Sequence, residues 1–313
     1  MRRAVVGLLL AGTLLTWTAM AAAQSKVSAG DNWQTDLSSW RAQHAKDLQA
    51  PQGWLALIGL DWLKAGDNSF GAGADNAIPL PAKTAAHLGV LHLEGNTVEL
   101  LPPGGESGFP KGMLVDGRTP STGQKLALDV PGPPSKITIG TLAMVVVRRG
   151  DRIGLRTRDS QAPSLTGFHG LRWYPPAAQF RIQARWIPYT PPKQIAVPTV
   201  IGTEEKYDVP GVAEFTMEGK TFRLEPVLEG PEEKDLFFIL RDATSKTETY
   251  QASRFLYTEF PDHGLTQPGM LLLDFNRAEN PPCAYSHFTT CPLPPKGNVL
   301  PVAITAGEKR YHE

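Results

Sequence analysis

The sequence has little cysteine, no excess of charge of either sign and no second long hydrophobic run. Its 313 residues include 31 basic and 31 acidic side chains, so the formal net charge at pH 7 is +0. Binding to nucleic acid depends on an excess of Lys and Arg that neutralises phosphates. The charge balance therefore excludes a sequence-wide polyanion partner. After residue 20, no apolar stretch is long enough to cross a bilayer.

The common catalytic signatures are also missing. The chain has no Gly-x-Ser-x-Gly elbow, no His-Glu-x-x-His metal helix, no Gly-x-x-x-x-Gly-Lys loop and no dinucleotide Gly-x-Gly-x-x-Gly. These absences remove the commonest hydrolases and nucleotide enzymes, and we expect no cofactor. A hydrolase with dispersed residues stays open, with His169 or His287 as the base. The spacing of the residues supports no particular triad.

Residues 1–23 have the three parts of a secretory signal peptide. Two arginines form a positive start, an apolar stretch follows, and three alanines precede the expected cleavage before Gln24. The two cysteines lie far from this point, at Cys283 and Cys291. A lipid anchor at the new N-terminus is therefore not expected. We expect a periplasmic or secreted protein.

The segment 24–52 is expected to carry an N-terminal helix. Apolar residues recur at helical spacing from Trp33 to Leu48, with His44 filling a gap, and Pro51 ends the pattern. We expect the tryptophans of this helix to anchor it on the body of the protein rather than to bind a ligand.

Short segments in which apolar and polar residues alternate follow, and some of the 30 glycines and 28 prolines separate them. This rhythm is typical of a β-sandwich or barrel. The expected strands of the first block, residues 53–160, are 90–93, 97–101, 125–128, 136–139, 144–148 and 153–158.

The first block also resembles a forkhead-associated (FHA) domain in the order of its short signatures. These lie at residues 66–71, 75–80, 84–87, 98–101, 115–117 and 137–140. The resemblance implies a β-sandwich. In that family a Gly-Arg pair and a Ser-x-x-His element bind phosphothreonine, but Ala72 follows Gly71 here, while Thr84 and His87 fit the second element loosely. Without the arginine, a phosphate has no main cationic partner, so phosphothreonine recognition is not expected.

The second block, residues 161–313, is expected to be an antiparallel sheet or barrel, because its connections are too short for crossover helices. Gly219 and Lys220 predict a hairpin turn, and residues 188–192 a stiff connector. The expected strands are 171–174, 180–186, 195–201, 213–217, 221–226, 235–240, 247–250, 253–258, 270–275 and 299–304.

Residues 274–295 form the most unusual stretch, Asp-Phe-Asn-Arg-Ala-Glu-Asn-Pro-Pro-Cys-Ala, then Cys-Pro-Leu-Pro-Pro. With this pattern the chain resembles an uncharacterised secreted family, domain of unknown function 1684. The similarity extends to Arg241-Asp-Ala-Thr, Thr249-Tyr, Arg254-Phe-Leu and the ending Leu-Pro-Val-Ala-Ile. This resemblance implies no activity, so function must be argued from the residues.

The two cysteines allow three interpretations. In an exported protein they are expected to form a disulfide, which would stabilise the fold by roughly 2.5 kcal/mol on the chain-entropy model. Alternatively, Cys283, His287 and Cys291 share the spacing of a zinc or copper site. The flanking prolines and the lack of an identifiable fourth ligand disfavour this metal site, and free thiols are the third interpretation.

Polar residues at the end of an apolar strand make the candidate ligand site. Arg binds planar anions through two hydrogen bonds, so a pocket with several arginines would suit a carboxylate- or phosphate-bearing small ligand. The alternative is that these residues pair with one another and brace the proline-rich loop. The candidate residues are Arg241, Asp242, Arg254, Asp274, Asn276, Arg277 and Asn280.

Two further groups of residues admit a functional and a structural interpretation. Arg152, Arg156 and Arg158 share one face of an expected strand, either as an anion site or as a solvated or interdomain ion-pair face. The aromatic-rich residues 168–175 either line a pocket at the domain junction or pack in the core. For both groups we expect the structural interpretation, which is a solvated or interdomain ion-pair face for the arginines and core packing for the aromatic residues.

We therefore expect a mainly β protein with an N-terminal helix, an FHA-like β-sandwich and a C-terminal antiparallel β-sheet or barrel domain. The leading functional hypothesis is a periplasmic binding or interaction protein with an Arg-rich pocket for a small anionic ligand or an envelope partner. The alternative is a hydrolytic or metal-assisted enzyme that uses the same C-terminal pocket. A purely structural envelope component is a third possibility.

Intact mass spectrometry of the protein expressed in a bacterial periplasm tests the expected maturation. We expect a chain that begins at Gln24, that is lighter than the reduced form by two hydrogens and that resists thiol alkylation. Two alkylatable thiols with a metal-sized increment in the native mass would contradict the disulfide and favour the metal site.

Overall fold

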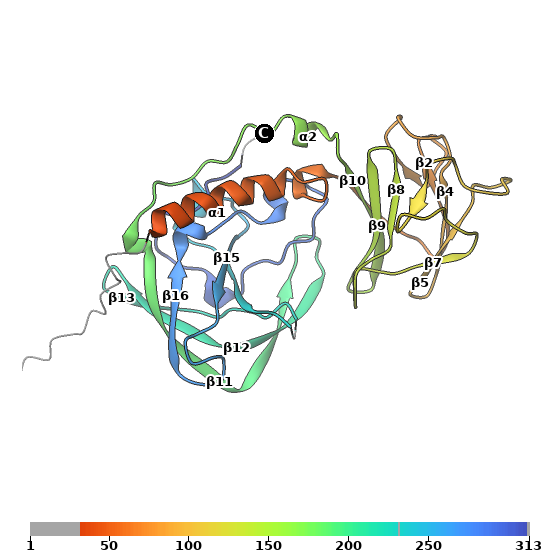
Figure 1. The fold of residues 1–313 in the computed structure, drawn as a ribbon. Helices are drawn as coiled ribbons and strands as arrows, with labels where there is room; N and C mark the ends of the chain where they lie inside the picture. Colours follow the sequence, from red (N-terminus) through yellow and green to blue (C-terminus); the bar gives the residue numbers. More distant parts are fainter. Residues whose placement is uncertain (1–31, 231, 312–313) are drawn as a thin grey trace, which may run out of the picture.

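The computed structural model describes residues 32–230 and 232–311. The expected signal peptide lies outside these residues. Figure 1 shows two β lobes side by side, with helix α1 (Trp33–Leu48) lying along the lobe that contains β11 to β16. The expected N-terminal helix is therefore confirmed. Leu37 and Leu48 are its buried residues, and none of the described helices is long and apolar enough to span a membrane.

Two five-stranded sheets form the N-terminal lobe, here called the N-terminal sandwich. Their strand orders are β1-β10-β9-β8-β6 and β3-β2-β4-β5-β7, with antiparallel pairing except between β2 and β3. One apolar core draws on both sheets, with Phe70, Leu91 and Ile137 fully buried. The strands are β1 (Leu57–Trp62), β2 (Gly66–Gly71), β3 (Ile78–Pro79), β4 (Gly89–Glu94), β5 (Thr97–Leu101), β6 (Leu114–Val115), β7 (Gln124–Leu126), β8 (Lys136–Ile139), β9 (Leu142–Arg149) and β10 (Arg152–Asp159).

Open antiparallel sheets, not a barrel, form the C-terminal lobe among the described residues. Strands pair in the orders β13-β12-β11-β16 and β14-β15. Their main core surrounds Trp186, Phe238 and Phe275. The strands are β11 (Arg181–Pro198), β12 (Glu204–Met217), β13 (Lys220–Leu224), β14 (Asp235–Leu240), β15 (Arg254–Glu259) and β16 (Gly269–Asp274).

Short helices join these strands. The α-helix α2 covers Pro163–Thr166. The 3-10 helices are η1 (Trp54–Ala56), η2 (Ala178–Phe180), η3 (Ala243–Lys246), η4 (Phe275–Arg277), η5 (Pro282–Ala284) and η6 (Lys296–Asn298).

Three predicted strands of the second block are wrong. Residues 171–174, 247–250 and 299–304 form no strand and make only isolated backbone bridges or turns. Their apolar side chains are used differently, because Leu300, Val302 and Ile304 pack into the core of the C-terminal lobe from an extended segment. The alternation of apolar residues therefore predicted correctly that these side chains are buried. It did not predict whether the segment pairs with a neighbouring strand.

The predicted strands 180–186 and 195–201 belong to one strand, β11. The expected stiff connector between them lies inside it, as an irregularity in the pairing between Pro188 and Lys193. Prolines cannot donate a hydrogen bond to a neighbouring strand, so the regular pairing with β12 stops and resumes beyond them. This strand is longer than the sequence predicts because it pairs with both β12 and β16.

The predicted hairpin is confirmed, but its turn lies one residue earlier than predicted, because Lys220 already belongs to β13. Met217 pairs with Lys220, and the two residues between them, Glu218 and Gly219, have φ of 51° and 72°. Positive φ at both central residues is the geometry of the tight turn whose twist matches paired strands. Glycine allows it at the second position without steric cost.

Candidate functional site

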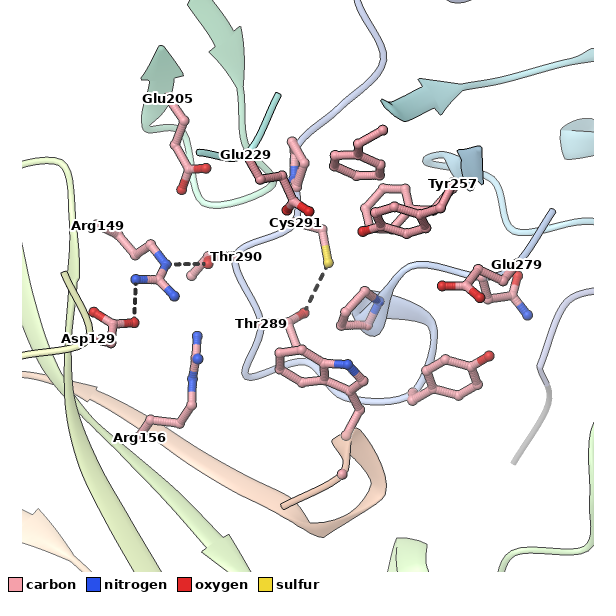
Figure 2. Close-up of a pocket in the computed structure, with 18 of the residues that line it drawn as sticks. Asp129, Arg149, Arg156, Glu205, Glu229, Tyr257, Glu279, Thr289, Thr290 and Cys291 are labelled. Atoms are coloured by element: carbon pink, nitrogen blue, oxygen red, sulfur yellow. Dashed lines mark hydrogen bonds and ion pairs between the residues drawn. The ribbon is translucent and has the colours of Figure 1, made fainter. Parts of the chain in front are cut away.

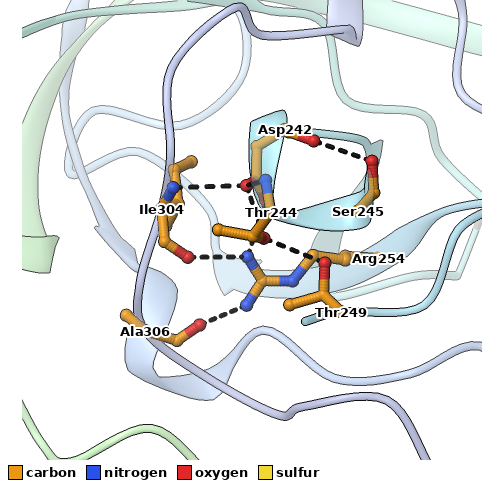
Figure 3. Close-up of polar contacts among 7 residues, drawn as sticks. All are labelled: Asp242, Thr244, Ser245, Thr249, Arg254, Ile304 and Ala306. Carbon is orange, nitrogen blue, oxygen red and sulfur yellow. Dashed lines mark hydrogen bonds and ion pairs between the residues drawn. The ribbon is translucent and has the colours of Figure 1, made fainter. Parts of the chain in front are cut away.

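The candidate ligand residues Asp242 and Arg254 are brought together, but inside the protein. Arg254 is fully buried, and its Nη1 lies 2.7 Å from Asp242 Oδ2 and 3.1 Å from the carbonyl oxygen of Ile304. Its Nη2 donates to the carbonyl of Ala306. The other carboxylate oxygen of Asp242 accepts hydrogen bonds from the backbone and side chain of Thr244. Figure 3 shows that the guanidinium is enclosed by these partners.

Asp274 and Asn276 form a second internally satisfied group. Asp274 accepts two hydrogen bonds from Asn276 and pairs with Arg181 at 3.2 Å. Asn276 also exchanges two hydrogen bonds with the backbone of Ala177. Both residues therefore hold η4 to the segment around Ala177, at the start of η2.

The remaining candidates lie apart from any shared arginine pocket. Arg241 is exposed, and its backbone pairs with residues 298 and 300. The guanidinium of Arg277 lies 5.9 Å from the ring centre of Trp40. Among the seven candidates, only Asn280 lines the interdomain cavity described next.

The disulfide is present. Cys283 and Cys291 are bridged, and the described residues hold no free cysteine. The metal interpretation of the two cysteines with His287 therefore does not hold, and no cluster of three or more possible metal ligands occurs among the described residues. The bridge closes the loop whose residues Thr289, Thr290 and Cys291 form part of a cavity wall.

This interdomain cavity, of about 1090 Å³, lies between the N-terminal sandwich and the C-terminal lobe. Clefts at domain junctions are common places for small-molecule sites. Figure 2 shows Arg149 and Arg156 on one side and Glu279 on the other, with the disulfide loop between them. Helix α1 and η1 complete the lining with His44 and Trp54.

Arginines make the wall that the N-terminal sandwich contributes. Arg149 is held at 2.7 Å from Asp129 and donates to Thr290 of the C-terminal lobe at 3.0 Å. Arg156 is only 6% exposed, and no described hydrogen bond or ion pair involves its guanidinium. Burial and the charges of Arg149 and Arg158 lower the pKa of Arg156 to about 10. Its closest aromatic contact is Trp54, whose ring centre lies 5.8 Å away.

The arginine stripe matches the expected solvated face at Arg152, which is exposed, and differs from it at Arg156, which is buried. Alternation on β10 is as predicted, since Ile153 and Leu155 enter the core of the N-terminal sandwich. On the opposite face Arg156 lies near Trp54 and lines the interdomain cavity, so it is buried without gaining a carboxylate partner. A buried cation without hydrogen bonds carries a desolvation cost that its surroundings do not offset.

A chain of acid and base groups forms the opposite wall. Glu279 Oε2 lies 3.4 Å from His44 Nδ1, and His44 Nε2 lies 3.4 Å from Glu308 Oε2. Glu308 is buried and accepts hydrogen bonds from Tyr285 Oη at 2.6 Å and the backbone N–H of Asn280 at 2.9 Å. Three separate parts of the chain therefore meet here, at α1, at the segment after η4 and near the C-terminus.

The electrostatics of this wall follow from burial. Burial raises the pKa of Glu279 to about 7, with the charge of Glu308 acting in the same direction and that of His44 opposing it. Burial lowers the pKa of His44, but the 3.4 Å contact with Glu308 and the charge of Glu279 outweigh it and raise that pKa. Perturbed groups in a cleft mark candidate functional sites.

A second cavity, of about 680 Å³, is lined by residues of β1 and β10 and by residues 79–83. Its charged residues include Lys83 and Asp159, which pair with each other at 2.6 Å. Burial raises the pKa of Asp61, which also lines it. This cavity holds a satisfied ion pair where the interdomain cavity holds an unpaired arginine.

Sequence reasoning missed Arg156 and Glu279 as cavity residues. In the sequence, Arg156 is one of three arginines on one face of an expected strand, and Glu279 lies inside the unusual stretch of residues 274–295. Nothing in the sequence shows which of these arginines is buried at the interdomain cavity. In the sequence, His44 stands out only because it interrupts the apolar face of the expected helix.

Residues 166–309 match the model of a family described as "Protein of unknown function (DUF1684)". This part of the chain is therefore a domain of unknown function. The solution NMR structure of an uncharacterized protein from Haloarcula marismortui is 30% identical, covering 46% of this chain and 78% of that chain, with a TM-score of 0.40. No curated protein matches the sequence.

Replacing Arg254 tests its bracing role. Arg254→Met leaves the buried carboxylate of Asp242 without its cation, which costs about 3–5 kcal/mol of unfolding free energy. Arg277→Met is the matched control and costs less than about 1 kcal/mol, because only a contact with Trp40 is lost. Urea unfolding measures both, and equal losses would contradict the assignment.

The raised pKa of Glu279 predicts how stability depends on pH. A carboxyl with a folded pKa of about 7 and an ordinary value of 4.5 binds its proton more tightly when folded. The unfolding free energy therefore falls as pH rises from 4.5 to 7. In Glu279→Gln this fall becomes shallower, as measured by urea unfolding at several pH values. Parallel curves for wild type and variant would show that Glu279 titrates normally.

Proposed function

We propose that this protein binds a small ligand with an anionic group in the interdomain cavity, and that Arg156 is the main contact of that group. The observation that carries the proposal is the buried guanidinium of Arg156, which lines the cavity and has no hydrogen-bonding partner among the described residues. A carboxylate or phosphate would provide two acceptors in the geometry that a guanidinium requires.

The neighbourhood of Arg156 supports an anion rather than a neutral group. Arg149 adds a second positive charge nearby, and Asp129, its ion-pair partner, offsets only one of the two. The low dielectric of a cleft strengthens the attraction to an anion. Trp54 packs beside the guanidinium and limits its movement, which reduces the entropy lost on binding.

The setting of this binding is part of the proposal. We infer from the features of residues 1–23 that the protein is exported and acts in the periplasm or outside the cell, either on a free small molecule or on an envelope partner. The resemblance of the N-terminal sandwich to FHA domains supports a scaffold role for it. Ala72 still stands where that family has its phosphate-binding arginine.

A hydrolytic role in the same cavity is the second candidate. The observation that favours it is Glu279, whose pKa of about 7 suits a group that takes up and releases protons near neutral pH. Its experiment is an assay of the purified protein on a panel of esters and phosphoesters, and no turnover on any of them would count against it.

Arg156→Met tests the binding proposal. We expect the affinity for hexanoate or inorganic phosphate to fall tenfold or more, because a hydrogen bond to a charged group contributes about 1.5–3 kcal/mol. Without ligand, the variant should be as stable as the wild type or more stable, because an unpaired buried charge is removed. Calorimetric titration at constant ionic strength and thermal unfolding give the two results.

Arg158→Met is the matched control. Arg158 lies on the same strand and at 5.7 Å from the same Trp54 ring centre, but does not line the cavity. Its replacement should leave the affinity for both anions unchanged. Equal anion affinity in the wild type and in Arg156→Met would refute the proposed function.

A further inference from the structure

A second guanidinium with an unused donor lies next to Arg156. Arg149 donates through Nη1 to Asp129 at 2.7 Å and through Nε to Thr290 at 3.0 Å. Its Nη2 takes part in no hydrogen bond with any described residue and is not enclosed. Figure 2 shows the guanidiniums of Arg149 and Arg156 extending toward each other, and the charge of Arg149 lowers the pKa of Arg156.

Both terminal nitrogens of Arg156 are free as well. No described residue accepts a hydrogen bond from its Nη1 or Nη2, and Nε is the only one of its side-chain nitrogens that is completely enclosed. Two sets of donors therefore meet at this end of the cavity, the Nη1 and Nη2 pair of Arg156 and the Nη2 of Arg149. A guanidinium binds a planar carboxylate through one pair of nitrogens, so a carboxylate on Arg156 would leave Arg149 Nη2 without an acceptor.

We propose that the anionic group of the ligand is a phosphate monoester, which Arg156 and Arg149 bind together. The inference rests on the proposed function and adds the chemical class of the anionic group. A phosphate monoester has three terminal oxygens in a tetrahedral arrangement. Two of them can accept hydrogen bonds from Arg156, and the third can accept one from Arg149.

The charges at this end of the cavity favour the same group. Among the described residues, Asp129 is the one carboxylate whose charge acts on Arg156, and it offsets one of the two guanidiniums. Glu205 also lines the cavity, but it accepts a hydrogen bond from Tyr207 of its own strand at 2.6 Å. The surroundings of Arg156 therefore keep a net positive charge. A phosphate monoester carries close to two negative charges above neutral pH, so its attraction to this end exceeds that of a carboxylate.

Contacts with both lobes hold Arg149 in position. Asp129 belongs to the N-terminal sandwich and also accepts a hydrogen bond from the backbone of Arg148 at 2.9 Å. Thr290 belongs to the disulfide loop of the C-terminal lobe, next to Cys291. A side chain that is already restrained loses little conformational freedom when it binds a ligand. The free Nη2 of Arg149 is therefore preorganised for an acceptor.

The experiment compares hexanoate, pentyl phosphate and pentyl sulfate, which share one alkyl chain, by calorimetric titration at pH 8 and constant ionic strength. We expect pentyl phosphate to bind at least about tenfold more tightly than hexanoate, because it gains a further hydrogen bond between charged groups. Pentyl sulfate has the same three oxygens but a single charge, so its affinity should lie between the other two. Equal affinities for the sulfate and the phosphate would contradict a doubly charged group.

A paired substitution isolates the contribution of Arg149. Arg149→Met together with Asp129→Asn removes the ion pair as a unit, so the net charge around Arg156 does not change. Hexanoate should bind this double variant as it binds the wild type, whereas the preference for pentyl phosphate should fall below about threefold. Arg152→Met is the matched control and should preserve the preference, because Arg152 is exposed on β10 and does not line the cavity. Thermal unfolding checks that each variant is folded.

A second measurement needs no variant. A phosphate monoester loses its second proton near a pH of about 6, so a site that prefers the doubly charged form binds pentyl phosphate more tightly as the pH rises through this value. Pentyl sulfate keeps one charge throughout and therefore corrects for Glu279 and His44, which titrate in the same cavity. The same pH dependence for both ligands would count against the assignment.

Vesicles distinguish the two sources of a phosphate monoester. If the wild type, but not the double variant, sediments with phosphatidylcholine vesicles that contain phosphatidic acid, the source is a lipid headgroup. If pentyl phosphate binds and the protein does not sediment, the source is a soluble ester.

The outcomes separate the two proposals. If hexanoate binds through Arg156 but pentyl phosphate binds no more tightly, or if its preference persists in the double variant, the phosphate assignment is wrong and the proposed function stands. If hexanoate, inorganic phosphate and pentyl phosphate all fail to bind, both proposals fall.

Discussion

The buried ion pair between Arg254 and Asp242 is the constraint on which the cavity wall depends. Arg254 donates to the carbonyls of Ile304 and Ala306 and so fixes an extended segment that has no strand pairing of its own. Glu308 follows two residues later and reaches both Asn280 and Tyr285. Because the segment cannot shift without breaking these hydrogen bonds, the arginine first considered as a ligand contact instead places the groups that line the cavity.

The cavity combines features that neither lobe has alone. The N-terminal sandwich contributes an arginine that its own strands leave unpaired, and the C-terminal lobe contributes the carboxylate of Glu279. Arg149 links the two walls through Asp129 on one side and Thr290 on the other. The disulfide between Cys283 and Cys291 restrains the loop that carries Thr290, so the separation of the walls is built into the fold.

The predictions from the sequence were correct where they depended on a single strand or on the chemistry of one or two residues. The hairpin at Gly219, the alternation on β10 and the cysteine pair were predicted because each follows from local backbone geometry or from the chemistry of two residues. It failed at residues 299–304, because alternation reports a buried face and not the partner that covers it. Arg254 and Arg156 show the same limit, since nothing in the sequence reveals which arginine finds a carboxylate.

By itself, the sequence determined the mainly β class and the N-terminal helix, because periodicity and turn residues act over a few neighbouring positions. The tertiary structure alone decided which polar groups are satisfied. Asp242 and Arg254 are 12 residues apart and meet in the core, whereas Arg156 lines a cavity to which both lobes contribute. Burial of a charge and the presence of its partner are properties of contacts between distant segments, and those contacts made one arginine a brace and the other a candidate for binding.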